Sequence, residues 1–310
     1  MRRAVSAMLT PVAAIGVDQR LTLKEKGVTD GKHPHQAVMT ATPIPRTLAM
    51  SVYADLETSI IDELPPGRKP VTTVVTSGER RKEVITRVAA ACAEGRQAYW
   101  VCTLIEDSDD LDAVSAEHMY QALSDALPAF RVGLLHGRMK SDEKVSVMQA
   151  FKAHQLDLLV ATTVVEVGVD VPNATLMVIE DADRLGLAQL HQLRGRVGRG
   201  TIASHCYLMF SQGLSKAAKT RLTAMRESQD GFFLAEQDLK LRGPGDILGT
   251  RQAGEQSFRV ADLGLHAHLM PRVIRSCDAL LAAPAGSPDA GKMTQLLAAW
   301  APADSGHLNV

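Results

Sequence analysis

Residues 156–160 are Leu156-Asp157-Leu158-Leu159-Val160, an almost unbroken apolar run. A short run of this kind is typical of a strand that is buried on both faces of a sheet. Between Gln36 and Phe210, similar runs alternate with amphipathic, helix-like stretches. Alternation of helices with buried strands predicts an α/β fold in which helices cover a parallel sheet.

The strands expected from this alternation are short and β-rich: Ala37–Thr40, Val71–Thr76, Ala98–Thr103, Arg131–Leu135, Leu156–Ala161, Thr175–Glu180 and His205–Phe210. Two of the amphipathic stretches between them have recognisable ends. Glu79–Glu94 is expected to stop at Gly95, because glycine commonly ends helices. Ser141–Ala153 is expected to begin with Ser141 as its N-cap.

The sequence changes character after these strands. Leu214–Glu227 and Phe232–Leu241 are expected to form two helices, followed by a glycine-rich segment. A further helix is expected over Leu263–Ala282. A linker rich in Pro, Ala, Gly and Ser then covers 283–291, and the end of the chain is expected to be disordered.

Composition is that of an ordinary globular protein, since 45% of the 310 residues are hydrophobic and 22% are charged. No apolar run approaches the ~20 residues that span a bilayer, and no signal-peptide core follows Met1, so we expect a cytoplasmic protein and no membrane partner. The four cysteines lack CxxC spacing, which argues against a metal site and for reduced thiols. The formal charge of −1 gives no support for nucleic-acid binding, so that support has to come from motifs.

The strongest functional signal is Gln189-Leu190-His191-Gln192-Leu193-Arg194-Gly195-Arg196-Val197-Gly198-Arg199-Gly200. Glycine lets a backbone approach a ligand closely, and the planar guanidinium of arginine matches phosphate oxygens. Arg196 and Arg199 are three residues apart and would point the same way on a helix or on the turn that follows one. The arginines and glycines alone are equally compatible with a solvated or RNA-binding basic turn.

With Gln192 included, the segment reads QxxGRxGR and resembles motif VI of superfamily 2 helicases. The resemblance implies a RecA-like helicase lobe in which Arg196 and Arg199 reach the γ-phosphate of ATP held by another lobe. Gln192 is then a further candidate for the catalytic site.

A second segment, Ala161–Pro172, reads ATTVVEVGVDVP and resembles motif V of the same superfamily. The resemblance implies that Thr162 and Thr163 meet nucleic-acid phosphates. It also implies that Gly168 and Asp170 lie toward the ribose of the nucleotide.

Two shorter segments resemble other helicase motifs. The string MTATP, which contains Thr40 and Thr42, resembles motif III, and this implies that the two threonines couple the lobes of the motor. The string HGRM begins at His136 and includes Arg138. It resembles the lobe-2 loop on the DNA path, so both residues become candidates for DNA binding.

Longer strings narrow the family. Thr40–Ala49 is similar in RecG-type helicases and in the transcription-repair coupling factor, whereas Asp62–Arg68 and Gly95–Cys102 look like RecG-type helicases specifically. The resemblance extends from about Gly16 to Trp300 and implies four regions. These are 1–35, the remnant of the end of helicase lobe 1; 36–210, a RecA-like C-terminal lobe; 211–282, a helical hairpin with a translocation motif; and 283–310, a linker, short helix and tail.

The translocation motif is the segment Asp238–Gln252, which resembles that of both helicase families. In these families a helical hairpin leads into a loop on duplex DNA. The resemblance implies that Arg242, Arg251 and Gln252 contact DNA. A plain Gly/Pro connection would explain the glycines of this segment but not its arginines.

The sequence also departs from the family. A complete helicase needs the phosphate loop GxxxxGK[ST], and the 310 residues contain no such string. The acidic motif expected just before Gly16 is absent too, because residues 10–15 read TPVAAI. ATP and Mg²⁺ are therefore expected for a full-length family member, whereas this chain alone is expected neither to bind ATP tightly nor to hydrolyse it. A truncated product, a mispredicted start or a disrupted gene would explain such a chain.

Three functions follow from these patterns. The first is a motor lobe of a RecG-like ATP-dependent DNA helicase that remodels branched or duplex DNA in recombination and repair. The second is a non-catalytic DNA-binding module, which either keeps weak DNA affinity or pairs with a separate lobe-1 chain. The third is an unrelated α/β enzyme whose arginines bind a small phosphorylated substrate.

Overall fold

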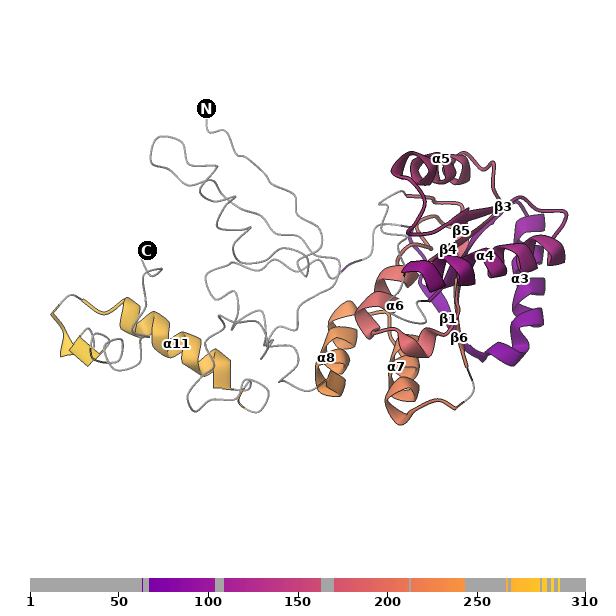
Figure 1. Cartoon of the computed structure of the whole chain (residues 1–310). Helices are drawn as coiled ribbons and strands as arrows, with labels where there is room; N and C mark the ends of the chain where they lie inside the picture. Colours follow the sequence, from indigo (N-terminus) through magenta and orange to yellow (C-terminus); the bar gives the residue numbers. More distant parts are fainter. Residues whose placement is uncertain are drawn as a thin grey trace, which may run out of the picture. The chain divides into compact units, whose positions relative to one another are not determined.

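Six parallel strands form a sheet in the order β1-β6-β5-β2-β4-β3 (Figure 1). Their bounds are β1 Val71–Ser77, β2 Gln97–Cys102, β3 Val132–Leu135, β4 Leu158–Thr162, β5 Ala174–Ile179 and β6 Ser204–Phe210. Six of the seven strands expected from the sequence, and the parallel α/β fold, are therefore confirmed. The remaining strand, Ala37–Thr40, lies outside the residues that the structure describes.

The structure is a computed structural model that describes residues 63, 67–103, 109–162, 170–211, 213–242, 266, 269–284, 286–288, 291–292 and 295. The helices are α3 Arg81–Ala93, α4 Asp109–Ala126, α5 Ser141–Lys152, α6 Leu187–Arg194, α7 Lys216–Glu227, α8 Gly231–Arg242 and α11 Met270–Leu281, with short 3₁₀ turns η2 Gly78–Arg80 and η3 Ala182–Arg184. The described residues up to Arg242 belong to one compact unit, and α11 belongs to a second. None of the helices in the described ranges is long and apolar enough to cross a membrane.

Helices cover both faces of the sheet, and alternate residues of a strand enter different hydrophobic cores. In β2, Ala98, Trp100 and Cys102 pack in the core that α3 and α4 complete. Tyr99 and Val101 pack in the other core, with side chains from α5, α6, α7 and α8. Every residue of β2 and of β4 is consequently buried. Burial on both faces explains the unbroken apolar runs from which the fold was predicted.

Local hydrogen bonds decide where the helices begin and end. α3 stops before Gly95, whose φ of +78° is left-handed and readily adopted only by glycine. The helix expected from Glu79 instead opens with the 3₁₀ turn η2, and α3 proper starts two residues later. The expected N-cap Ser141 is wrong. α5 is capped at Lys140, because the Glu143 carboxylate reaches back and accepts a hydrogen bond from the Lys140 amide at 3.1 Å.

Two helices follow the sheet near the ranges expected for them. Ser215 caps α7 by accepting a hydrogen bond from the Ala218 amide at 3.1 Å. α7 contacts β1, and α8 contacts α6 and α7, so the hairpin packs directly on the sheet unit. Gln229, which lies between the two helices, accepts from the Val71 amide at 3.1 Å and donates to the Val71 carbonyl at 3.0 Å. In the second unit, α11 falls within the helix expected over Leu263–Ala282.

Candidate nucleotide and nucleic-acid interface

The predicted site residues that the structure describes lie near the two ends of the strands. The end where the strands begin is called here the amino edge of the sheet, and the end where they stop is called the carboxyl edge. His136 directly follows β3 and Thr162 ends β4, and the register of these strands places the two residues next to each other at the carboxyl edge. Asp170 precedes β5 and Arg199 precedes β6, so both lie at the amino edge. A five-residue strand separates the two edges by about 16 Å, since each residue adds about 3.3 Å.

At the amino edge, the residues that follow α6 form a tight turn, 195–201, here named the motif VI turn. Gly198 has a φ of +73°, and a Cβ at that position would lie 2.6 Å from Cγ2 of Val71. A Cβ at Gly200 would lie 2.9 Å from the carbonyl oxygen of Pro172. These distances leave no room for a side chain. The glycines therefore let the turn approach β1 and the turn before β5, rather than only a ligand.

Charged residues lie in and beside this turn. Nη1 of Arg199 lies 3.4 Å from Oδ1 of Asp170, and the two side chains are 32% and 57% exposed. Arg196 belongs to the same turn and is half-buried. Burial raises the pKa of the Tyr99 hydroxyl to about 12, while Arg196 and Arg199 lower it and Asp170 raises it. The structure thus pairs Asp170 with Arg199 in the turn that also contains Arg196, while the ligand that these residues bind stays a prediction.

The third arginine of the motif, Arg194, has a different role that the sequence pattern did not reveal. It is 3% exposed, and its Nη1 donates to the carbonyl oxygens of Met225 at 2.7 Å and Ser228 at 2.9 Å, and to the Thr73 hydroxyl at 3.3 Å. Burial lowers its pKa. Arg194 therefore ties α6 to β1 and to the end of α7. Helical spacing could have indicated that Arg194 is buried, because it lies four positions after Leu190 on the apolar face of α6.

His191 supports the buried arginine from the preceding turn of α6. Its Nδ1 lies 3.1 Å from Nη2 of Arg194, which has only protons to offer, so Nδ1 is the acceptor. Burial, and secondly the charge of Arg194, lower the pKa of His191 to about 4. The adjacent Gln192 is exposed. In this segment Gln192 thus stays available to a ligand, whereas His191 belongs to the framework.

The carboxyl edge gathers polar atoms without partners. The hydroxyls of Thr162 and Thr103 are buried, with the residues 2% and 3% exposed, and neither makes a hydrogen bond in the described structure. Nδ1 of His136 is also buried and unpartnered, although its Nε2 lies 3.6 Å from a carboxylate oxygen of Glu117. Arg138 is exposed on the same loop. Thr103 was not expected at the site. Only its position could have indicated that Thr103 belongs here, because it directly follows β2, whose last residue Cys102 pairs with Thr162 of β4.

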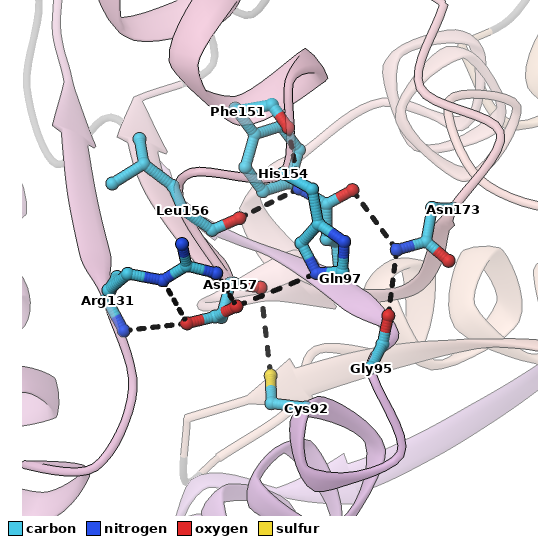
Figure 2. Close-up of polar contacts among 9 residues, drawn as sticks. All are labelled: Cys92, Gly95, Gln97, Arg131, Phe151, His154, Leu156, Asp157 and Asn173. Carbon is cyan, nitrogen blue, oxygen red and sulfur yellow. Dashed lines mark hydrogen bonds and ion pairs between the residues drawn. The ribbon is translucent and has the colours of Figure 1, made fainter.

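A network of hydrogen bonds holds the turn before β5 in place, and Figure 2 shows its members. The buried Gln97 side chain donates to the carbonyl oxygens of Phe151 at 2.6 Å and Leu156 at 2.8 Å. Asn173 donates to the carbonyl of Gly95 at 2.9 Å and to Oε1 of Gln97 at 3.3 Å, and the Gln97 amide donates back to the Asn173 carbonyl at 3.0 Å. The network therefore fixes Asn173, three residues beyond Asp170.

A separate ion pair joins the starts of β3 and β4 at the amino edge (Figure 2). Asp157 accepts hydrogen bonds from the amide, Nε and Nη2 of Arg131 at 2.9, 3.0 and 2.7 Å. The hydrogen bond from Arg131 lowers the pKa of Asp157. This pair belongs to the framework, since it joins the starts of two neighbouring strands.

Several predicted site residues lie outside the described residues: Thr40, Thr42, Thr163, Gly168, Arg251 and Gln252. Arg242 is the last residue of α8, and its side chain likewise lies outside what is described.

Fold and motif spacing define the C-terminal lobe of a superfamily 2 helicase. The family model described as "Helicase conserved C-terminal domain" matches residues 80–201, which include the strands β2 to β5 and the motif VI turn. A second model, "ATP-dependent DNA helicase RecG, domain 3, C-terminal", matches residues 228–287. The chain belongs to the RecG family. The second match favours this family over the transcription-repair coupling factor, whose motifs are partly the same.

Individual relatives agree with this assignment. The chain is 62% identical over 261 residues to ATP-dependent DNA helicase RecG of Escherichia coli strain K12, and 49% identical over 263 residues to that of Bacillus subtilis strain 168. Each match covers 84% of this chain and 38% of the relative. A solved structure of RecG bound to a three-way DNA junction is similar with a TM-score of 0.63 and 45% identity, over 78% of this chain and 31% of that one.

Proposed function

We propose that this chain supplies the second motor lobe of a RecG-type ATP-dependent DNA helicase that remodels branched DNA in recombination and repair. The observation that carries the proposal is the ion pair of Arg199 with Asp170 at the glycine-tight turn that also contains Arg196. The chain spans 38% of the length of E. coli K12 RecG, and it contains no GxxxxGK[ST] string. The lobe therefore acts with a chain segment that presents the phosphates. The cytoplasmic location expected from the sequence is part of this proposal.

The described residues fit the phosphate and ribose side of a nucleotide. ATP, when bound, supplies the phosphoryl group and the charge that develops during its transfer. Arg199 is held by an exposed ion pair, and such pairs contribute only about 0–1 kcal/mol, so a phosphate group can replace Asp170 as its partner. Arg196 and Arg199 then stabilise the developing charge with their planar guanidinium groups. Asp170, once released, is free to accept a hydrogen bond from a ribose hydroxyl.

No Mg²⁺ ligand is assigned to this chain. Among the described residues, no group of three or more His, Cys, Asp or Glu side chains is arranged to hold a metal ion. The family's use of ATP implies that Mg²⁺ accompanies the nucleotide, and its ligands in that case come from the partner segment.

The carboxyl edge suits a nucleic-acid backbone. Hydroxyls, imidazole N–H groups and guanidinium groups are donors to phosphate oxygens, and Thr162, His136 and Arg138 carry these groups. The buried hydroxyl of Thr162 has no partner in the described structure, so a phosphate oxygen would satisfy it. The proposed DNA contacts of Thr163, Arg242, Arg251 and Gln252 rest on the family motifs alone.

The function is tested with a chimera in which this chain replaces the matched segment of E. coli K12 RecG. We expect DNA-stimulated ATP hydrolysis by the chimera and a fall in kcat on the order of 10³-fold in Arg199→Ala, because an arginine finger is worth 10³–10⁵ in related enzymes. Arg226→Ala is the matched control, since Arg226 is exposed on α7 and pairs with the adjacent Glu227. Turnover that is equal in the two variants would remove the assignment of Arg199.

The isolated chain provides a second test. We expect no ATP hydrolysis from it, with or without branched DNA. A DNA-dependent turnover that Arg199→Ala abolishes would show that the chain has a phosphate site of its own.

A non-catalytic DNA-binding module is the second candidate, and the separation of the two sheet edges favours it. The DNA-facing residues stand about 16 Å from the nucleotide-facing residues and need no nucleotide for their placement. This function predicts DNA affinity that falls with salt and is the same with and without ATP, even in the chimera.

A further inference from the structure

Gly67 and Arg68, which lie four and three residues before β1, are close to the motif VI turn. Arg68 Nε donates a hydrogen bond to the carbonyl oxygen of Gly198 at 3.0 Å, across 130 positions of sequence. Gly67 has a φ of +82°, and a Cβ there would lie 3.8 Å from Cγ2 of Thr201. The segment that leads into β1 is therefore hydrogen-bonded to the middle of the turn through Arg68 and passes close to its end at Thr201.

The turn depends on such outside support because it leaves helical geometry early. The amides of the two residues after Gly195 bond to carbonyls three residues back rather than four. The Arg196 amide donates to the Leu193 carbonyl at 3.0 Å, and the Val197 amide donates to the Arg194 carbonyl at 3.3 Å. Beyond them, Arg199 Nε donates back to the Gly195 carbonyl at 3.4 Å, which is long for a hydrogen bond. Both bonds have a guanidinium donor, and the bond from Arg68 is 0.4 Å shorter, so it is the stronger of these two side-chain bonds.

We propose that Arg68 is a positioning residue for the arginines of motif VI. Gly198 lies between Arg196 and Arg199, so a fixed Gly198 carbonyl sets the direction in which the backbone presents both guanidinium groups. The bond also ties the segment before β1 to the nucleotide-facing turn, and a shift of that segment moves the arginines with it. The catalytic part of this inference rests on the proposed function, whereas the structural part does not.

Hydrogen–deuterium exchange of the full chain tests the structural part. Arg68→Met keeps the length of the side chain and removes the donor, whereas Arg68→Lys keeps a donor. We expect amides of residues 195–203 to exchange about 3- to 10-fold faster in Arg68→Met, the factor that corresponds to one lost hydrogen bond. Arg68→Lys is expected to restore most of the protection. The control Lys69→Met removes a neighbouring exposed cation and is expected to change nothing.

The pattern of exchange distinguishes positioning from general loosening. Faster exchange confined to the turn supports the proposal. Unchanged exchange of the turn in Arg68→Met overturns it, and so does an equal increase in the strands of the sheet. Thermal unfolding of each variant shows whether it is folded. If Arg68→Met does not fold, the decision rests on Arg68→Lys, for which native exchange of the turn supports the proposal and exchange as fast as in the unfolded chain overturns it.

Kinetics of the chimera test the catalytic part. We expect Arg68→Met to lower kcat for ATP hydrolysis about 10- to 100-fold while KM for ATP stays within about two-fold, because arginine fingers act on the transition state. Arg68→Lys is expected to recover at least half of the rate. A normal kcat in Arg68→Met overturns the catalytic inference. If the unaltered chimera fails to hydrolyse ATP, the proposed function fails, and the exchange experiment still decides whether Arg68 holds the turn.

Discussion

Arg194 and Arg199 belong to one motif but have opposite surroundings. A buried guanidinium is costly unless hydrogen bonds replace its hydration, and Arg194 has two carbonyls, a hydroxyl and an imidazole nitrogen for this purpose. Arg199 is partly exposed, and its ion pair with Asp170 contributes little. One arginine is thus a fixed part of the framework, whereas the other is free to exchange partners.

The stability of the sheet unit should depend on pH through His191. Its pKa is about 4 in the folded chain, below the usual 6.5, so between these values the unfolded chain binds a proton that the folded chain does not. The contribution of neutral His191 is therefore complete above pH 6.5 and decreases as the pH falls to 4, by up to about 3 kcal/mol. We expect His191→Asn to flatten this decrease, because Oδ1 of asparagine still accepts from Arg194.

Urea unfolding between pH 4 and pH 7.5 measures this effect. His118→Asn on α4 is the control, since His118 is exposed and should leave the pH dependence as it is in the unaltered chain. An equally steep loss of stability in His191→Asn would mean that another group causes it.

At the scale of elements, the turns at the amino edge are held by side chains rather than by the sheet. Gln97 joins β2 to the end of α5 and to the loop before β4, and Asn173 joins it to the start of β5. Buried amides of this kind fix loops whose backbone groups have no strand or helix partner. The network therefore fixes the backbone around Pro172, and the motif VI turn approaches the Pro172 carbonyl closely at Gly200.

Replacement of Gln97 tests this network. Gln97→Leu removes the side-chain donor to the Leu156 carbonyl and leaves the Phe151 carbonyl with the His154 amide as its donor, and we expect it to lower the free energy of unfolding by about 1–3 kcal/mol. Gln121→Leu is the control, because Gln121 lies on the exposed side of α4 and its side chain donates to the Asp125 carboxylate at 2.9 Å. Equal costs in chemical denaturation would show that Gln97 is replaceable packing.

The strands could be predicted from the sequence, whereas helix ends and short helices were harder. Burial on both faces makes β2 apolar after Gln97 and β4 apolar up to Thr162, and that signal is visible in the single sequence. The cap of α5 could not be predicted, because Ser141 and Lys140 compete and the reach of Glu143 decides between them. α6 has eight residues and merges into a glycine-rich turn, so its spacing relates Arg194 to Leu190 but does not show where the helix begins and ends.

At the scale of the whole molecule, the spacing of motifs identified the candidate residues but not their arrangement. The motif V segment contributes Thr162 to one edge of the sheet and Asp170 to the other, although only eight positions separate them. Sequence order alone gives no sign of this division, which depends on the direction of each strand. Within the described residues, the sheet and the helices packed on it join the two edges.

Because the proposed DNA-binding residues lie at the carboxyl edge, a substitution there is expected to weaken DNA binding without disturbing the amino edge. We expect Arg138→Ala to weaken binding of branched DNA by the full chain about 3- to 10-fold and to reduce the salt dependence by roughly the share of one phosphate. Fluorescence anisotropy over a range of salt concentrations measures both quantities, with Arg226→Ala as the control. Affinity and salt slope that match those of the unaltered chain would place Arg138 off the DNA path.

The bond pair between Gln229 and Val71 has a consequence for association between molecules. Among the described strands β1 is an outer one, and an outer strand presents amide and carbonyl groups to which a strand of another molecule can add. The side-chain amide of Gln229 occupies both groups of Val71, as a neighbouring strand would. One glutamine thus blocks the start of β1 against strand addition, which keeps this end of the sheet from seeding aggregates.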